Sequence, residues 1–167
     1  MLATRRTFLT GSAATAVVAA LGVGYGPLPA PEVGRVLLSA GEGALVAAIA
    51  DAMFPTGGAF GVGASEIDIV ASMDTLLGES LDPEVGVAVR WLLRALEAGT
   101  IASRGASFVA LSLDDRRAVL ATWADNVVLP RRLAHDLLRM AFGMAFYNSA
   151  AALRQIGWGT ACRGGHA

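Results

Sequence analysis

The stretch LSAGEGALVAAIADAMFP, residues 38–55, has the pattern of one complete amphipathic helix. Ser39 and Glu42 have the spacing of a capping box, in which each side chain accepts a hydrogen bond from the other residue's backbone N–H. Apolar side chains then recur at a spacing of four, which is typical of one face of a helix: Leu45, Ile49 and Met53. The final proline of the stretch and the glycines at 57 and 58 predict where this helix ends.

The rest of the chain repeats the helical period between turns rich in Gly and Pro. Further helices are predicted to open at five places: Ser65, Asp82, Ser112, Pro130 and Ser149. The second and third helices are predicted to end at Gly78 and Gly99, and the helix from Pro130 carries one apolar face: Leu133, Leu137, Met140 and Met144. No segment alternates convincingly with a period of two. The prediction is therefore an all-α fold, a single small domain of about five or six helices.

Length and composition limit the classes of function. The chain has 167 residues, which suits one domain. Its 13 basic residues are all arginine and are balanced by 14 acids, without a basic cluster on one element, so a nucleic-acid partner is not expected. Apolar residues make up 54% of the chain. After the N-terminus, however, no run of about 18 strongly apolar residues follows, which argues against a protein with several membrane spans.

The residues that carry catalytic or metal chemistry are few. A single cysteine excludes an internal disulfide, a cysteine-based zinc site and an iron–sulfur cluster within this chain, and no CxxCH motif is present for haem attachment. His135 and Asp136 are adjacent, and neighbouring helix positions point about 100° apart, so they do not pair as a catalytic base and its orienting acid. We therefore predict no catalytic residue, no metal site and no cofactor in this chain.

The N-terminus has the pattern of an export signal. The run TRRTFL, residues 4–9, resembles the twin-arginine (Tat) consensus, and a mildly apolar stretch follows over residues 11–23 before a proline-rich exit. The predicted targeting residues are Arg5, Arg6, Phe8 and Leu9. We accordingly divide the chain into a Tat signal segment over residues 1–30, a linker over 31–38 and a helical domain over 39–167. The expected location is the periplasm or cell envelope, with the Tat translocon as a transient partner.

Whether the signal segment is cleaved off after export is a separate question. The best cleavage motif is Leu28-Pro29-Ala30, which has Ala before the cut but Leu in place of a small residue at the outer position. Retention of the segment as a membrane anchor is the alternative. The apolar core is short for a full span, which argues against that alternative.

Aromatic residues gather near the C-terminal end of the chain, separated by small residues. They are Phe142, Phe146, Tyr147 and Trp158. Such a cluster either completes the domain's own core or anchors a partner protein. Arg131 and Arg132 stand at the start of a predicted helix, where cations are mildly unfavourable. The pair therefore marks either an acidic contact on a partner or a solvated face.

These elements together resemble the gluconate 2-dehydrogenase subunit 3 family. The resemblance rests on the Tat signal, on the capped first helix and on short motifs further along. The first helix supplies Leu38-Ser39, Glu42, Leu45, Ile49, Asp51, Phe54 and Pro55. The later motifs are Phe108 with Leu111-Ser112 and Arg117, then Phe146-Tyr147 with Ser149, and Ile156-Gly157-Trp158. The resemblance covers about residues 38–162, although 74–106 carry no motif of the family.

The resemblance implies a role without chemistry of its own. Members of the family are small subunits of periplasmic flavin dehydrogenases, whose large subunit resembles glucose–methanol–choline oxidoreductases and holds the FAD. A cytochrome c subunit, carrying haem c, often takes the electrons. The large subunit usually has no export signal and is thought to leave the cell bound to the small subunit. The ending Gly-Trp-Gly-Thr-Ala-Cys departs from the family, which leaves Cys162 as a candidate for pairing with another chain.

Two other classes stay open on the sequence. The chain could be an enzyme by itself, with a cofactor in its helical core, although no motif supports this. It could also be an exported or membrane-anchored helical scaffold unrelated to redox chemistry. A co-purifying flavoprotein separates the subunit hypothesis from both.

Overall fold

The computed structural model describes residues 27–58 and 61–157, and these residues contain six α-helices and no strand. The helices are α2 (Ala40–Met53), α3 (Ile69–Thr75), α4 (Pro83–Arg104), α5 (Leu113–Ala124), α6 (Leu129–Tyr147) and α7 (Ala150–Gln155). The all-α prediction is therefore confirmed. Within the same residues, none of the helices is both long and apolar enough to cross a membrane.

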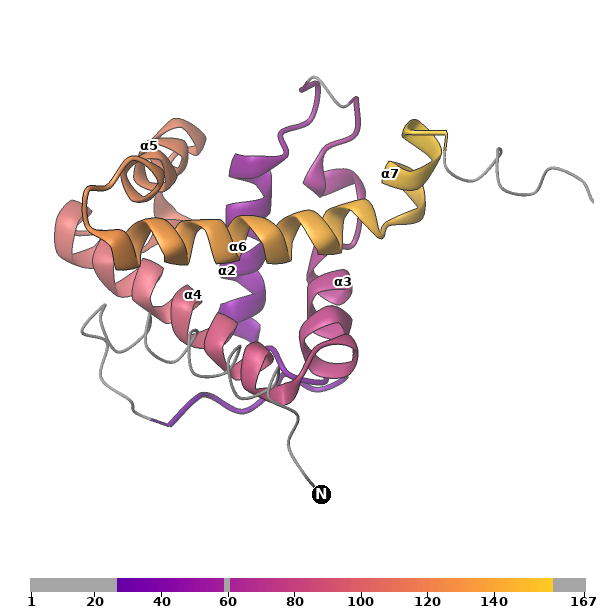
Figure 1. Ribbon diagram of the computed structural model, residues 1–167, viewed down its shortest axis with the longest axis horizontal. Coiled ribbons are helices and arrows are strands. Elements are labelled where there is room, and N and C mark those ends of the chain that lie inside the picture. The colour runs from indigo at the N-terminus through magenta and orange to yellow at the C-terminus, as the bar shows by residue number, and fades with distance from the viewer. Residues whose placement is uncertain (1–26, 59–60, 158–167) are drawn as a thin grey trace, which may run out of the picture.

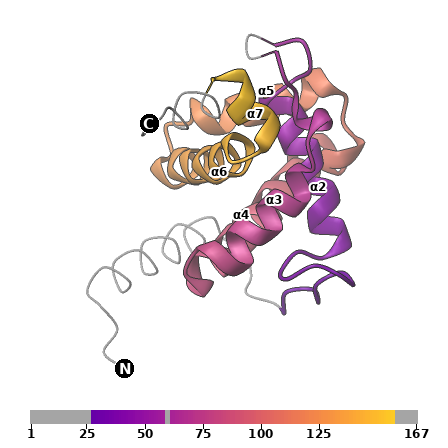
Figure 2. The same ribbon diagram turned by 90° about the vertical axis from the view of Figure 1, so that its right-hand side faces the viewer.

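The helices cross one another rather than lie in a parallel bundle. Figure 1 shows α6 running across the front of α2, with α4 below it and α5 at one end. Figure 2, turned by 90°, places α6 and α2 on opposite sides of the molecule. The core is made of large, fully buried side chains from nearly all of these elements: Leu38, Ile49, Met73, Leu77, Leu92, Leu93, Leu96, Phe108, Leu138, Phe142 and Phe146.

The start of α2 is fixed by the predicted capping box. The Ser39 backbone N–H donates to Glu42 Oε2 at 2.9 Å, and the Glu42 N–H donates to Ser39 Oγ at 3.3 Å. The same carboxylate binds Arg90 of α4 through two hydrogen bonds, from Nε and from Nη2, each 2.9 Å long. Both side chains of this ion pair are only 6% exposed. Arg90 therefore ties α4 to the first turn of α2.

A second buried carboxylate holds the chain just before α2. Asp74 of α3 accepts hydrogen bonds from three successive backbone N–H groups, those of residues 36, 37 and 38, at 2.7, 2.9 and 2.7 Å. Burial by itself raises the pKa of this carboxyl. The three N–H donors and the nearby Arg35 guanidinium outweigh that effect, so the pKa of Asp74 lies below its ordinary value of 3.8. We refer to Ser39, Glu42, Asp74 and Arg90 as the N-terminal clasp.

Several helix boundaries differ from the predicted ones. The helix expected to end at Gly99 continues to Arg104 and ends at Gly105, whose φ of +70° is the left-handed conformation that glycine adopts readily. Gly99 lies inside the helix facing Trp123, since a Cβ atom there would be 3.6 Å from the indole ring. The helix expected from Ser65 begins at Ile69, because Asp68 caps it by accepting from the Ala71 N–H.

The remaining turns and caps are close to the predictions. A 3₁₀ turn over Ala64–Glu66 comes before α3, and one turn of π-helix over Leu76–Ser80 carries the chain past the predicted stop at Gly78. A second 3₁₀ turn, Phe108–Ala110, precedes α5. Ser112 and Ser149 cap α5 and α7 as predicted, and α6 opens one residue before Pro130.

Candidate docking surface

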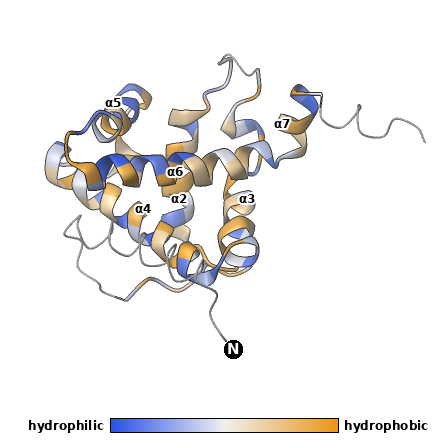
Figure 3. Ribbon diagram, viewed as in Figure 1, coloured by the Kyte–Doolittle hydropathy of each residue, from blue (hydrophilic) through white to orange (hydrophobic). Residues whose placement is uncertain are grey.

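Helix α6 has apolar side chains on two opposite faces. The inward face is fully or nearly fully buried and consists of Ala134, Leu138, Ala141, Phe142, Ala145 and Phe146. The stripe predicted from the sequence lies on the other side, where Leu133 is 41% exposed, Met140 62% and Met144 44%. Hydrophobic and hydrophilic bands alternate along this helix in Figure 3. The fourth residue of the stripe, Leu137, is partly buried against the core, so the three exposed side chains are the ones that need another explanation.

The outward face of α6 is hollowed at Gly143. A Cβ atom at this position would meet nothing within 4 Å. Two open depressions adjoin it, with volumes of about 680 and 450 Å³, and both include Arg139 and Tyr147, one helical turn before and after the glycine. Met140 and Met144 border the larger one. Because methionine is flexible and polarisable, it suits a surface that adapts to a partner.

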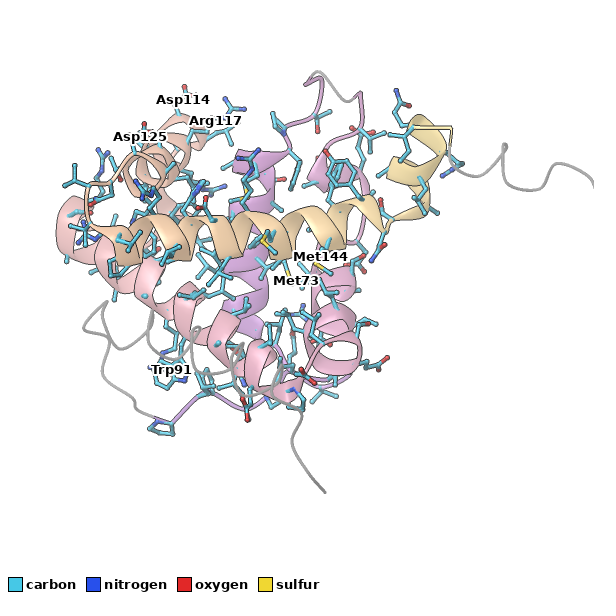
Figure 4. The ribbon with its side chains drawn as sticks, in the orientation of Figure 1. Met73, Trp91, Asp114, Arg117, Asp125 and Met144 are labelled. Carbon is cyan, nitrogen blue, oxygen red and sulfur yellow. The ribbon has the colours of Figure 1, made fainter. Side chains whose placement is uncertain are left out.

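An apolar groove continues this face toward α4. Its volume is about 150 Å³, and its lining is Leu81, Val85, Ala88, Val89, Leu92, Leu137, Met140, Ala141 and Met144. Figure 4 labels Met144 on α6, together with Met73, which belongs to α3 and is fully buried.

We define the α6 outer face as Leu133, Leu137, Met140, Gly143, Met144 and Tyr147.

Helix α6 carries three exposed arginines, of which Arg139 borders the hollow. Arg131, Arg132 and Arg139 are exposed, and none of the three guanidinium groups has a hydrogen bond or ion pair within residues 27–58 and 61–157. Asp136 is the acid among them, and its Oδ1 lies 3.5 Å from Nδ1 of His135. That histidine nitrogen is buried and has no hydrogen-bond partner among the described atoms. The Arg139 guanidinium at the hollow is therefore able to bind a carboxylate.

The aromatic cluster near the C-terminal end is divided between core and surface. Phe146 stacks on Phe54 with ring centroids 4.3 Å apart, and Tyr147 meets both rings edge-on, at 6.3 Å from Phe54 and 5.3 Å from Phe146. Phe142 and Phe146 are fully buried, so of the two roles left open on the sequence, core or partner anchor, these two side chains take the first. Tyr147 is 44% exposed at the rim of the hollow and can touch a partner.

The other predicted site residues lie outside the described part of the chain. They are the targeting residues Arg5, Arg6, Phe8 and Leu9, the aromatic Trp158 and the thiol of Cys162. Within residues 27–58 and 61–157, no three His, Asp or Glu side chains are placed so that they could hold a metal ion. The buried acids Glu42 and Asp74 are bonded to Arg90 and to backbone N–H groups.

Sequence reasoning did not find the groove to α4 or the hollow at Gly143. Both depend on how α6 is rotated against its neighbours, and the apolar pattern of α6 is compatible with either face turned inward. One signal was present: the inward face alternates alanine with large residues, as helices in close contact do.

One comparison with known proteins finds a family. A family model described as Gluconate 2-dehydrogenase subunit 3 matches residues 40–158, which is well over half of the chain and includes all six helices. No curated protein and no solved structure matches the chain.

Proposed function

The chain belongs to the gluconate 2-dehydrogenase subunit 3 family, and on that premise we propose that it is the non-catalytic small subunit of a periplasmic, FAD-dependent sugar or alcohol dehydrogenase. In this proposal it binds and stabilises the flavoprotein large subunit and carries that subunit through the Tat pathway. The FAD belongs to the large subunit, and haem c belongs to a cytochrome subunit where one is present. The chain itself performs no step of the reaction.

The observation that carries the proposal is the α6 outer face. A helix whose inward face already completes the core gains nothing in the isolated chain from an apolar outward face, because exposed apolar area is unfavourable in water. Burial against a partner recovers about 25 cal/mol for each Å² of apolar surface removed from water. Leu133, Met140 and Met144 provide such area around a hollow that another protein's side chain can enter.

The large subunit is the occupant that this surface fits. Family membership supports a multi-subunit dehydrogenase as the assembly. Arg139 at the hollow favours a partner surface that carries an acid beside apolar residues, since a guanidinium binds a carboxylate with two parallel hydrogen bonds. The contact we propose is therefore an apolar, acid-bearing element of the flavoprotein lying along α6.

Export is the second part of the proposal, and it depends on the N-terminal motif. Tat carries folded proteins, so a small subunit with the twin-arginine motif can take a bound partner with it. Replacing both Arg5 and Arg6 by Lys should leave the small and the large subunit together in the cytoplasm. Should the large subunit still reach the periplasm with this variant, the carrier role is wrong, even though the complex itself can exist.

The test of the whole proposal is affinity purification of the full chain from its native host. A tag at the C-terminus keeps the export motif free. We expect one large partner and the visible absorbance of a bound flavin, and the partner's substrate can then be assayed directly. A colourless, partner-free monomer would contradict the proposal and favour a helical scaffold unrelated to redox chemistry.

A further inference from the structure

The described chain begins with a segment that is bound to α4. Residues 27–38 appear in indigo in Figure 1, below α4 and leading to α2. Arg94 Nη1 donates to the carbonyl oxygen of Pro27 at 3.0 Å, and Arg90 Nη2 donates to that of Pro29 at 2.5 Å. Between these two carbonyls, the Leu28 side chain packs against the hydrophobic core. Three consecutive residues are therefore held by α4 and the core.

The two arginines that bind this segment are themselves held in place. The Arg90 guanidinium is fixed by its two hydrogen bonds to Glu42, so its remaining donor is oriented before the segment binds. Arg94 lies over the ring of Trp91, with its guanidinium carbon 5.0 Å from the ring centre. Figure 4 shows Trp91 on the side of α4 near the beginning of the described chain. Donors positioned in this way lose little entropy when they bind a carbonyl.

Further contacts hold the chain between Glu32 and α2. The Glu32 N–H donates to the carbonyl of Leu38 at 3.0 Å, and Glu32 and Arg35 form an ion pair at 2.9 Å. Asp74 binds the three N–H groups that follow. At Gly78 a Cβ atom would come within 2.6 Å of Val36, so the glycine lets the segment approach closely. The stretch over residues 31–38, predicted as a linker, is thus hydrogen-bonded to the domain.

From this geometry we propose that residues 27–30 belong to the folded domain and stay with it after export. The bond between Ala30 and Pro31, which is the best cleavage motif in the sequence, is then not cut, and any processing takes place before Pro27. This inference rests on the proposed export but concerns a different property, the position at which the exported chain begins.

The physical reason is that a peptidase must bind the residues before the cut in its own cleft. Here those residues are already bound, with both proline carbonyls accepting from arginine and Leu28 on the core. The bond also precedes a proline, whose nitrogen has no hydrogen to donate to the enzyme. Cleavage after Ala30 would require the segment to leave α4, which would remove one bonding partner of the buried Arg90.

The direct test is the intact mass of the exported chain. The full chain, tagged at its C-terminus, is recovered from the envelope fraction of its native host. We expect a mass that places the N-terminus at Pro27 or before it. A mass that begins at Pro31 would overturn the inference while leaving the subunit role intact. Absence of the chain from the envelope would count against export instead, and a stability comparison then decides the inference.

That comparison uses the full chain carrying Arg5→Lys and Arg6→Lys, purified from the cytoplasm. Leu28→Ala removes the contact with the core, whereas Val33→Ala changes a fully exposed side chain in the same segment and is the matched control. We expect the first variant to lower Tm by about 2–4 °C and the control to leave it unchanged. Equal Tm values for the two variants would show that residues 27–30 are not part of the domain.

Discussion

The N-terminal clasp and the α6 outer face represent opposite ways of using polar and apolar groups. In the clasp, the buried charges of Glu42, Asp74 and Arg90 are matched by hydrogen bonds at 2.5–2.9 Å. On the α6 outer face, Met140 is 62% exposed beside guanidinium groups that have no partner in the described part of the chain. The clasp therefore stabilises the fold, whereas the α6 outer face is the surface that we propose a second molecule covers.

The largest expected effect comes from breaking the clasp at its ion pair. Arg90→Ala leaves the Glu42 carboxylate buried without its counter-charge, which we expect to cost about 3–5 kcal/mol of unfolding free energy. Urea denaturation of the full chain measures this loss. Arg131→Ala, an exposed arginine on α6, is the control and should change stability by less than about 0.5 kcal/mol. Similar losses for the two variants would remove the distinction between the regions.

A smaller effect is expected at the second buried carboxylate. Asp74→Asn keeps the size of the side chain but removes its charge, and we expect a loss of about 1–3 kcal/mol at neutral pH, because three backbone donors lose a charged acceptor. Denaturation of both proteins across pH tests the cause. The folded pKa lies below the unfolded value of about 3.8, so the contribution of the charge is full above that pH.

Acidification should therefore remove the difference between the two proteins. As pH falls through the lowered pKa, the Asp74 carboxyl takes up a proton and the wild-type chain loses the stabilisation that the Asn variant already lacks. A difference that stayed constant down to pH values well below the ordinary carboxyl range would show that shape, and not charge, is what the backbone donors require.

The smallest expected effect on stability is at the hollow of α6, where we expect a gain in unfolding free energy and not a loss. Gly143→Ala fills open space in the interior of a helix, so it should stabilise the isolated chain by about 0.5–1 kcal/mol. Thermal unfolding measures this as a rise in Tm. A fall in Tm would mean that the hollow is already occupied by part of the chain itself, which would contradict its assignment as a partner surface.

The same comparison explains what the sequence could predict. The capping box of α2 is local, spans four residues and is confirmed, as are the caps of α5 and α7. The other clasp contacts are distant along the chain, since Asp74 binds Leu38 across 36 residues and Arg90 binds Glu42 across 48, and neither Asp74 nor Arg90 stands out in a periodic pattern. Only the packing of α3 and α4 on the start of α2 brings them together.

The errors have equally physical causes. Gly99 was predicted to end a helix, but it lies inside α4, where a Cβ atom would make only an ordinary contact with the Trp123 ring, and the left-handed conformation that ends the helix is at Gly105. The stripe from Leu133 to Met144 was found correctly as one face of α6, yet its periodicity does not tell which neighbour, if any, it meets. Phe142 and Phe146, and not the methionines of the stripe, face the core, because aromatic side chains bury more apolar area than leucine or methionine.

The most direct test of a partner surface on α6 is capture of the large subunit by two glycine variants of the tagged full chain. Gly143→Leu fills the hollow, and Gly41→Leu adds the same side chain at an exposed, unobstructed position of α2. We predict that neither variant has a Tm below that of the wild type, while Gly143→Leu recovers at least about tenfold less flavoprotein, a loss of about 1.4 kcal/mol in binding. Equal recovery by the two variants would contradict the assignment of the α6 outer face as the binding surface.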